Sequence, residues 1–486
     1  MEYDIVIGLE IHSELKTRSK IFCGCRNEFG GEANTQCCPV CLGMPGTLPV
    51  LNRTALEYAI KAGLALNCKI SRFSKLDRKN FFYPDMPKAY QISQYDLPIC
   101  YDGYVDIEVN GEGKRIGIER IHIEEDAGKL VHDPYGQGTL IDYNRCGVPL
   151  IEIVTRPDVR SPEEARILFE TIKSILEYTE VSDCRMQEGS IRADVNLSIK
   201  PRGQEALGIR TEMKNINSLR AVQRAAESEA KRQAGVLGKG RTVIQETRRW
   251  DDNKGESFSM RSKEEAMDYR YFPEPDLVPI VVDEEWLATI KNSIPELPQS
   301  RKDRYVRELG IPRYDAALIT MNKRVADLFD TATALCGNAK TVSNWIMTDL
   351  LRRMNEKGES VLDSPLNGKR FGEILLFLEK GEITQASAKR IMDEVEETGE
   401  NPSVIIDRLG LKVQRDENLV LGTVKKVVQD NPQALKDYAA GKEKAFGFLM
   451  GKVMGMLKGK GDPTQVRELL TKELQDLCSQ GDIQTL

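Results

Sequence analysis

The feature that most constrains the fold is a strict alternation of apolar and polar residues in segments far apart in the sequence. The first segment spans residues 3–12, where isoleucine or leucine fills every second position. This is the period of a β-strand with one buried face. The other face carries Glu10 and His12, about 7 Å apart along the strand. The pair could form half of a metal site, and a solvated strand face is the simpler alternative.

The clearest alternation lies at residues 191–199, and another strand is predicted at 209–215. The polar faces of these two strands carry Arg192, Asp194, Asn196, Arg210, Glu212 and Lys214. If the strands are neighbours, Asp194 and Glu212 lie together and basic side chains flank them. Charged cross-strand ladders are ordinary on exposed sheets. The prediction of a site therefore rests on several acid-bearing strands taken together.

A third alternating run, residues 121–128, ends in three consecutive acids at 124–126. It is out of phase with the isoleucines before it, which predicts a β-bulge near residues 119–120. Adjacent carboxylates repel one another unless a cation lies among them. The nearest basic residue in the sequence is Lys129, so a hard divalent cation is the simplest explanation for the acids.

Four cysteines follow the first strand in a pattern typical of a zinc knuckle. Cys23 and Cys25 form a C-x-C pair, and Cys38 and Cys41 form a C-x-x-C pair twelve residues later. Four thiolates close a tetrahedral structural site and leave no position for water. Cys37 could replace Cys38, but only Cys38 gives the x-x spacing to Cys41. The alternative is a set of four free thiols.

Residues 77–96 form a polar and aromatic segment with two prolines and five aromatic residues. Its pattern fits neither the helix period nor the strand period. Long irregular segments inside a domain are usually functional or disordered, and the aromatic content favours an ordered one. Arg78 and Lys79 could contact phosphate, and a packed surface loop is an equal alternative.

Composition excludes several classes of protein. The chain has 486 residues, 40% hydrophobic and 30% charged, with a formal net charge of −6, which argues against broad electrostatic capture of nucleic acid. It has neither a signal-peptide layout at its start nor an apolar run of membrane-spanning length, so we expect a cytoplasmic protein. Eleven cysteines in such a chain suggest metal binding rather than disulfides.

Several common catalytic motifs are absent from the sequence. Neither the G-x-x-x-x-G-K-[ST] loop nor a G-x-G-x-x-G turn after a strand occurs, and there is no G-x-S-x-G elbow. The chain contains only three histidines. Any nucleotide chemistry must therefore rest on a metal cluster carried by strands.

The segments predict a mixed α/β (α+β) protein with three domains. Residues 1–293 hold the strands and the zinc knuckle, residues 294–408 are helical, and residues 409–486 form a small helical tail. In the first domain we expect helices capped by Asn52 and Ser161, a long polar helix at 218–234 that stops at Gly235, and strands at 242–245 and 269–272.

The tail carries a local basic segment, residues 442–460, with five lysines and one glutamate. Glycines space the segment, and a basic turn followed by a helix suits contact with an RNA backbone. A solvated helix face is an equal alternative.

These residues resemble one known family, the B subunits of the tRNA-dependent aspartyl/glutamyl amidotransferases. The resemblance runs through the whole chain in order. It is carried by IGLEIHSEL (7–15), CPVCLGMPG (38–46), DRKNFFYPDMPKAYQISQ (77–94), HIEEDAGK (122–129), DYNRCGVPLIEIVTRPD (142–158), RADVN (192–196), TEMKNINS (211–218) and FGFLMGKVM (446–454).

The resemblance implies a fold and a reaction. The expected fold is a large mixed-sheet cradle, then a helical domain and a small helical tail that contacts tRNA. ATP would phosphorylate the side-chain carboxylate of Glu-tRNA(Gln) or Asp-tRNA(Asn), because a free carboxylate has too poor a leaving group. Ammonia would then displace phosphate from the acyl phosphate and give Gln-tRNA(Gln) or Asn-tRNA(Asn). Carboxylate-bound Mg²⁺ would neutralise charge in the phosphoryl transfer.

The resemblance also implies site residues and partners. The magnesium site would be lined by Glu10, His12, Glu124, Glu125, Asp194 and Glu212, and structural zinc held by Cys23, Cys25, Cys38 and Cys41. From their type and strand face, we expect Lys79, Arg192 and Lys214 to bind phosphate or developing charge. The partners would be the amidase (glutaminase) and a small third subunit of the same heterotrimer, the misacylated tRNA and a cognate non-discriminating aminoacyl-tRNA synthetase, with no membrane. The glutaminase would supply the ammonia.

Two other functions compete with this one. A zinc-dependent nucleobase deaminase is suggested by His12-Ser13-Glu14 ahead of a C-x-x-C, but that class needs P-C-x-x-C and an open zinc position. Here Cys37 precedes Cys38, and four thiols would fill the ion. A non-catalytic RNA-binding adaptor with a zinc knuckle and basic tail would bind tRNA without ATP turnover.

Overall fold

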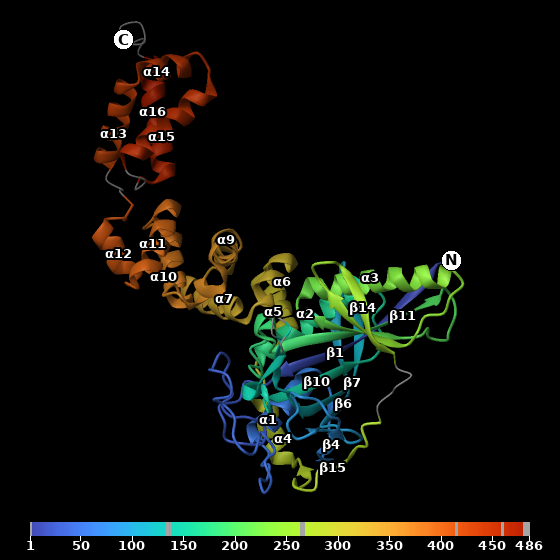
Figure 1. Cartoon of the computed structure of the whole chain (residues 1–486). Coiled ribbons are helices and arrows are strands. Elements are labelled where there is room, and N and C mark those ends of the chain that lie inside the picture. Colours follow the sequence, from blue (N-terminus) through green and yellow to red (C-terminus); the bar gives the residue numbers. More distant parts are fainter. Residues whose placement is uncertain are drawn as a thin grey trace. The chain divides into compact units, whose positions relative to one another are not determined.

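The structure is a computed structural model that describes residues 2–132, 136, 138–262, 268–413, 417–457 and 461–479. The chain forms two compact units, Met1–Pro298 and Gln299–Leu486 (Figure 1). The predicted mixed α and β class is confirmed, with a large sheet in the first unit and helices in the second. The predicted division at 408/409 stays a prediction. Among the described residues, no helix is both long enough and apolar enough to cross a membrane.

One nine-stranded sheet organises the first unit, in the order β14-β13-β12-β11-β1-β10-β7-β6-β2. Only the β12–β13 pair is parallel among these neighbours. The strands are β1 (Tyr3–Glu14), β2 (Lys69–Ile70), β6 (Cys100–Val109), β7 (Glu112–Glu125), β10 (Pro149–Thr155), β11 (Ile191–Pro201), β12 (Thr211–Ile216), β13 (Glu246–Asp251) and β14 (Glu256–Ser262).

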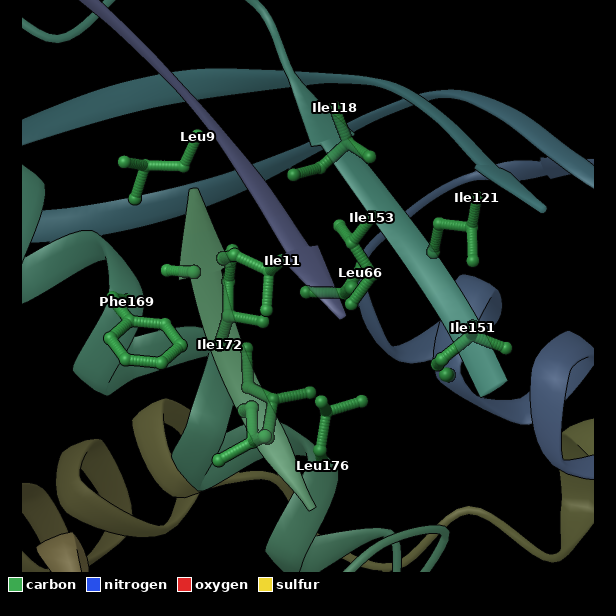
Figure 2. Close-up of a cluster of buried hydrophobic side chains, with 14 of the residues drawn as sticks. Leu9, Ile11, Leu66, Ile118, Ile121, Ile151, Ile153, Phe169, Ile172 and Leu176 are labelled. Carbon is green, nitrogen blue, oxygen red and sulfur yellow. The ribbon is translucent and has the colours of Figure 1, made fainter. Parts of the chain in front are cut away.

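Three helices bury the apolar face of this sheet: α1 (Arg53–Ala65), α2 (Pro162–Tyr178) and α3 (Leu219–Gly238). Figure 2 shows Leu9 and Ile11 of β1 gathered with Phe169 and Ile172 of α2. All four are fully buried, and each such side chain contributes roughly 1.5–3 kcal/mol by leaving water. Because side chains alternate along a strand, this burial fixes the opposite face as the one that carries the polar residues.

Two bulges adjust the sheet. The register between β7 and β10 shifts at Val154/Thr155, opposite Glu119, and this confirms the predicted bulge. The second bulge lies between β11 and β12, where the register shifts between Ala193 and Val195. Asn215 there adopts a φ of 68°, a left-handed conformation that asparagine tolerates. Extra residues of this kind re-aim the side chains beside them.

The segment 77–96 contains two strands, so its description as irregular is wrong. β4 (Asp77–Asn80) and β5 (Tyr90–Ser93) pair with each other, and β15 (Phe272–Pro273) adds to β4. Strands of four residues are too short for an alternation of apolar and polar residues to be recognised. In addition, the Arg78 guanidinium is held by the hydrogen bonds that it donates to the Glu274 carboxylate and not by an apolar layer. Two further small sheets pair β3 (Phe73–Ser74) with β16 (Ile280–Val281) and β8 (Lys129–His132) with β9 (Thr139–Asp142).

Some of the other helix and strand boundaries predicted from the sequence are confirmed. Asn52 and Ser161 cap α1 and α2 as predicted. The predicted strand at 242–245 is wrong: these residues are not in a strand, and the ladder with β14 starts at Glu246. The long helix does not stop at Gly235 but ends at Gly238, because Gly235 is exposed and a helix tolerates glycine there at modest cost.

The second unit is helical. Its first part comprises α5 (Pro298–Leu309), α6 (Arg313–Met321), α7 (Lys323–Cys336), α8 (Ala339–Trp345), a π-helical turn (Ile346–Leu350), α9 (Leu351–Lys357), α10 (Gly368–Glu379), α11 (Gln385–Thr398) and α12 (Pro402–Leu409). The tail helices α13 (Glu417–Asp430), α14 (Pro432–Ala439), α15 (Glu443–Met456) and α16 (Pro463–Ser479) share a separate hydrophobic core. Lys458 and Lys460 of the basic segment lie outside the described residues.

Alanine substitutions at two helical glycines are expected to change stability in opposite directions. A Cβ on Gly63 of α1 would lie 2.3 Å from the Cys100 sulfur, whereas nothing lies within 4 Å of a Cβ on Gly235 of α3. We expect Gly63→Ala to lower the free energy of unfolding by about 1–3 kcal/mol through overpacking. Gly235→Ala should raise it by about 0.5–1 kcal/mol, because alanine favours a helix. Urea unfolding measures both, and a loss of stability in Gly235→Ala would place the helix end at Gly235 after all.

Candidate functional site

The polar face of the sheet aligns charged side chains from neighbouring strands. His12 of β1 lies opposite Glu152 of β10, and Glu152 lies opposite His122 of β7. On the other side of β1, Glu10 lies opposite Asp194 of β11. Strand pairing thus brings residues from four distant segments together on one face of the sheet, in two adjacent rows.

The first cluster on this face joins His12, Glu124 and Glu152, whose ligand atoms all lie within 4.8 Å of one another. Both His12 Nε2 and His122 Nε2 lie 3.4 Å from Oε2 of Glu152. The Nδ1 atoms of both histidines are buried and have no hydrogen-bond partner. Two carboxylates and an imidazole with free donor atoms fit a divalent cation. We call this group the His/Glu cluster.

Lysine and histidine charges balance the His/Glu cluster. Burial opposes ionisation of Glu124, but a hydrogen bond from His122 holds its pKa below the usual value. In turn, burial disfavours the His122 cation, yet Glu152 and Glu124 raise the pKa of His122 to about 9. Lys79 of β4 is half-buried, and although partial burial opposes its charge, Glu124 and neighbouring groups raise its pKa. Lys79 therefore stays protonated under the influence of the acids of the cluster, and its role at phosphate stays a prediction.

A second cluster joins Glu10, Asp194 and Glu212, again with ligand oxygens within 4.8 Å. Lys214 forms ion pairs with Asp194 and Glu212, the latter at 3.0 Å. The bulge in β12 makes this contact, because Lys214 and Asn215 together face Asp194. The pKa of Glu10 is raised by burial and then by the charge of Glu152, so the two clusters interact. The acids therefore form two adjacent groups, not the single ion site expected from the sequence.

Glu125 belongs to neither cluster, which corrects the sequence prediction. It follows Glu124 on a strand, so it points to the opposite face, where its carboxylate accepts hydrogen bonds from Lys88 Nζ and the Ile92 amide. Asp126 is also satisfied, by Arg145 at 3.0 Å and by Arg192 at 3.5 Å. The sequence suggested that no protein cation lies near these acids. It missed these partners because they come from distant segments.

The three basic residues predicted to bind phosphate have different neighbours in the structure. Lys79 faces the His/Glu cluster, Lys214 lies in the second cluster, and Arg192 contacts Asp126 beside them. In the described part of the chain, the Arg192 guanidinium makes this one ion pair and no hydrogen bond, so donors remain for an anion. Glu152 and His122 were not predicted from the sequence as site residues. Their alternation with isoleucines was the signal that could have found them.

The four zinc-knuckle cysteines come together as predicted. The sulfur atoms of Cys23, Cys25, Cys38 and Cys41 all lie within 4.8 Å of one another, a donor set that fits tetrahedral zinc. Cys37 is not among them, because its thiol donates to the Asn34 carbonyl. A hydrogen bond from Cys23 lowers the pKa of Cys41 to about 5. Buried Lys20, 3.9 Å from the Cys41 sulfur, adds a positive charge that favours thiolate.

This geometry predicts a structural role for the bound metal. Chelation of zinc should lower the melting temperature by about 5–10 °C, because the four thiolates would lose the ion that holds the loop. Cys41→Ser should abolish stoichiometric zinc in metal analysis, whereas Cys37→Ser should retain it. Loss of zinc from Cys37→Ser would mean that Cys37 is a ligand.

Comparisons with known proteins agree with these features. The family model described as "GatB/GatE catalytic domain" matches residues 5–288, and the "GatB domain" model matches residues 327–474. Proteins named as the B subunit of an aspartyl/glutamyl-tRNA(Asn/Gln) amidotransferase are similar over nearly the whole chain. That of Caldicellulosiruptor bescii is 57% identical and that of Caldicellulosiruptor saccharolyticus 56%, each covering 98% of this chain and 100% of the relative. That of Carboxydothermus hydrogenoformans is 51% identical, with the same coverage. The chain belongs to the family of amidotransferase B subunits.

Proposed function

We propose that this chain is the kinase and transamidase subunit of a tRNA-dependent amidotransferase. The enzyme is a ligase that forms carbon–nitrogen bonds with glutamine as the nitrogen donor. The observation that carries the proposal is the His/Glu cluster with the half-buried, protonated Lys79, because this combination suits phosphoryl transfer.

The reaction has two steps on the same substrate. The side-chain carboxylate of Glu-tRNA(Gln) or Asp-tRNA(Asn) attacks the γ-phosphorus of ATP, and ADP leaves. Ammonia then attacks the acyl carbon of the resulting acyl phosphate, inorganic phosphate leaves, and a proton is released as the amide forms. The cationic Lys79 and the free donors of Arg192 hold the phosphoryl oxygens in position.

The acidic residues suit a divalent cation such as Mg²⁺, which would neutralise charge on the phosphates. His12, Glu124 and Glu152 would hold it, and Glu10, Asp194 and Glu212 form the adjacent group of donors. Lys214 already neutralises part of that second group, so it favours one cation at the His/Glu cluster over two.

The proposal includes partners and a location. A glutaminase partner would supply ammonia, and a small third protein and the misacylated tRNA would complete the assembly, with a non-discriminating synthetase as a further partner. The cytoplasmic location expected from the sequence belongs to the proposal, because aminoacyl-tRNA is made and used there. Structural zinc at the four cysteines is supported by their geometry.

The deaminase alternative lacks support in the geometry. Deamination needs zinc with an open position and a glutamate beside it. The four clustered cysteines fill a zinc ion, and His12 lies in a different cluster with Glu124 and Glu152. No observation favours the non-catalytic adaptor over the enzyme.

Replacement of Glu124 tests the proposed chemistry. In the complex with both partner subunits, Glu124→Gln should reduce tRNA-dependent phosphate release from ATP at least about 100-fold, because a charged donor of the His/Glu cluster is lost. Glutamine hydrolysis by the partner should remain measurable. Glu119→Gln on the same strand, an exposed acid outside the clusters, is the matched control. Full phosphate release by Glu124→Gln would remove this residue from the site.

Deletion of Gly410–Leu486 tests the role of the tail. The tail helices have their own hydrophobic core, so their removal should leave the first unit folded. We expect affinity for tRNA to fall at least about tenfold, because lysine contacts with phosphate are lost. A variant in which Lys442, Lys444 and Lys452 become glutamine should show a weaker salt dependence of binding. Unchanged affinity in the deletion would place tRNA recognition elsewhere.

A further inference from the structure

Three tyrosines from two distant segments form an aromatic group, which we call the aromatic platform: Tyr95, Tyr269 and Tyr271. The rings of Tyr95 and Tyr271 stack with centroids 4.4 Å apart and an interplanar angle of 12°. Tyr269 meets Tyr271 edge-on at 6.2 Å, and Phe81 meets Tyr269 in the same way at 6.2 Å. The backbone fixes this arrangement, because the Asn80 amide donates to the Tyr269 carbonyl and Phe272 pairs with Arg78.

The platform lies beside the His/Glu cluster. Lys79 Nζ is 5.0 Å from the centroid of the Tyr269 ring, and Glu124 raises the pKa of the same lysine. The residue before Tyr95 also contacts the strand that carries Glu124, because the Ile123 amide donates a hydrogen bond to the Gln94 side chain at 3.0 Å. Lys79 therefore connects the two features, with the aromatic rings on one side and the acids on the other.

The platform is open to solvent at Tyr95, whereas Tyr269 and Tyr271 are half-buried. Tyr95 is 61% exposed although one face of its ring is stacked, and Phe82, next to Phe81, is 86% exposed. Within the described part of the chain, none of the three tyrosine hydroxyls makes a hydrogen bond, so hydroxyl bonding does not explain their position. Exposed aromatic side chains of this kind are how proteins stack the bases of single-stranded nucleic acid.

The proposed reaction limits what can occupy the platform. The carboxylate that accepts the phosphoryl group belongs to an amino acid esterified to the terminal ribose of tRNA. The terminal base is joined to that same ribose, so it must lie within the reach of the aminoacyl ester and ribose from the cluster. An open row of rings suits the end of a single strand, whereas the base of a lone nucleotide is usually enclosed in a pocket.

We propose that Tyr95, stacked on Tyr271, binds the 3′-terminal base of the misacylated tRNA and so positions the esterified amino acid at the His/Glu cluster. This inference rests on the proposed function and adds a substrate-positioning residue to it. Tyr95 contacts the substrate through stacking and takes no part in proton or phosphoryl transfer.

Kinetics of the assembled complex test the role of Tyr95. Tyr95→Ala should raise KM for the misacylated tRNA about 5- to 100-fold and leave KM for ATP unchanged, because the stacked base is lost. Tyr95→Phe keeps the ring and should behave as wild type. Tyr101→Ala on β6, another exposed tyrosine of the same unit, is the matched control. A rise in KM for ATP alone would assign the platform to adenine of ATP and overturn the proposal, as would unchanged constants.

A binding cycle gives a readout that is independent of catalysis. Uncharged tRNA(Gln), with and without its 3′-terminal nucleotide, is titrated against the wild-type and Tyr95→Ala complexes without ATP. For the wild-type complex, removal of the nucleotide should weaken tRNA binding as much as Tyr95→Ala weakens binding of full-length tRNA. For the Tyr95→Ala complex, removal of the nucleotide should not weaken binding further. An equal loss of affinity in both complexes on removal of the nucleotide would overturn the proposed role of Tyr95. If the effects of Tyr95→Ala and nucleotide removal on binding are coupled in this way but the wild-type complex releases no phosphate, only the proposed function is overturned.

Discussion

The candidate site depends on the pairing of β1 with β10 on one side and β11 on the other. Through this pairing, Glu10 and His12 lie between acids from segments more than one hundred residues away. The pairing is stable because the isoleucines and leucines of the same strands are buried under α1, α2 and α3. Since a one-residue slip would move every side chain to the other face, burial of the core also fixes the register of the site. Stability and site geometry thus have the same physical origin.

A buried row of acids costs free energy unless nearby groups compensate for it. The described residues provide compensation at three places: Lys79 and His122 at the His/Glu cluster, Lys214 at the second cluster, and Arg145 with Arg192 at Asp126. These cations leave some donor atoms without partners, notably the Nδ1 atoms of His12 and His122. Polar atoms that are buried and unsatisfied are uncommon in folded proteins, and these two belong to the histidines that contact Glu152 at the proposed cation site.

The first unit separates stability from chemistry in space. The four cysteines form a donor set that fits tetrahedral zinc with no open position, which suits a structural role in the loop after β1. The acids on the polar face retain donor atoms and lie next to cations and exposed aromatic rings. This division suits a ligase that binds a nucleotide, a nucleic-acid end and ammonia at one surface.

The sequence by itself determined the strands with one buried face, the bulge at Glu119, the caps at Asn52 and Ser161, and the zinc cysteines, because these depend on neighbouring residues or short spacings. It also placed Glu10, His12, Glu124, Asp194 and Glu212 on polar strand faces. Only the tertiary structure decided that these acids form two clusters, that Glu125 faces Lys88, and that Glu152 and His122 join the site. The physical reason is that each of these features needs a partner from a distant segment. Local periodicity gives the face on which a residue lies, but strand order and register determine which residues it meets.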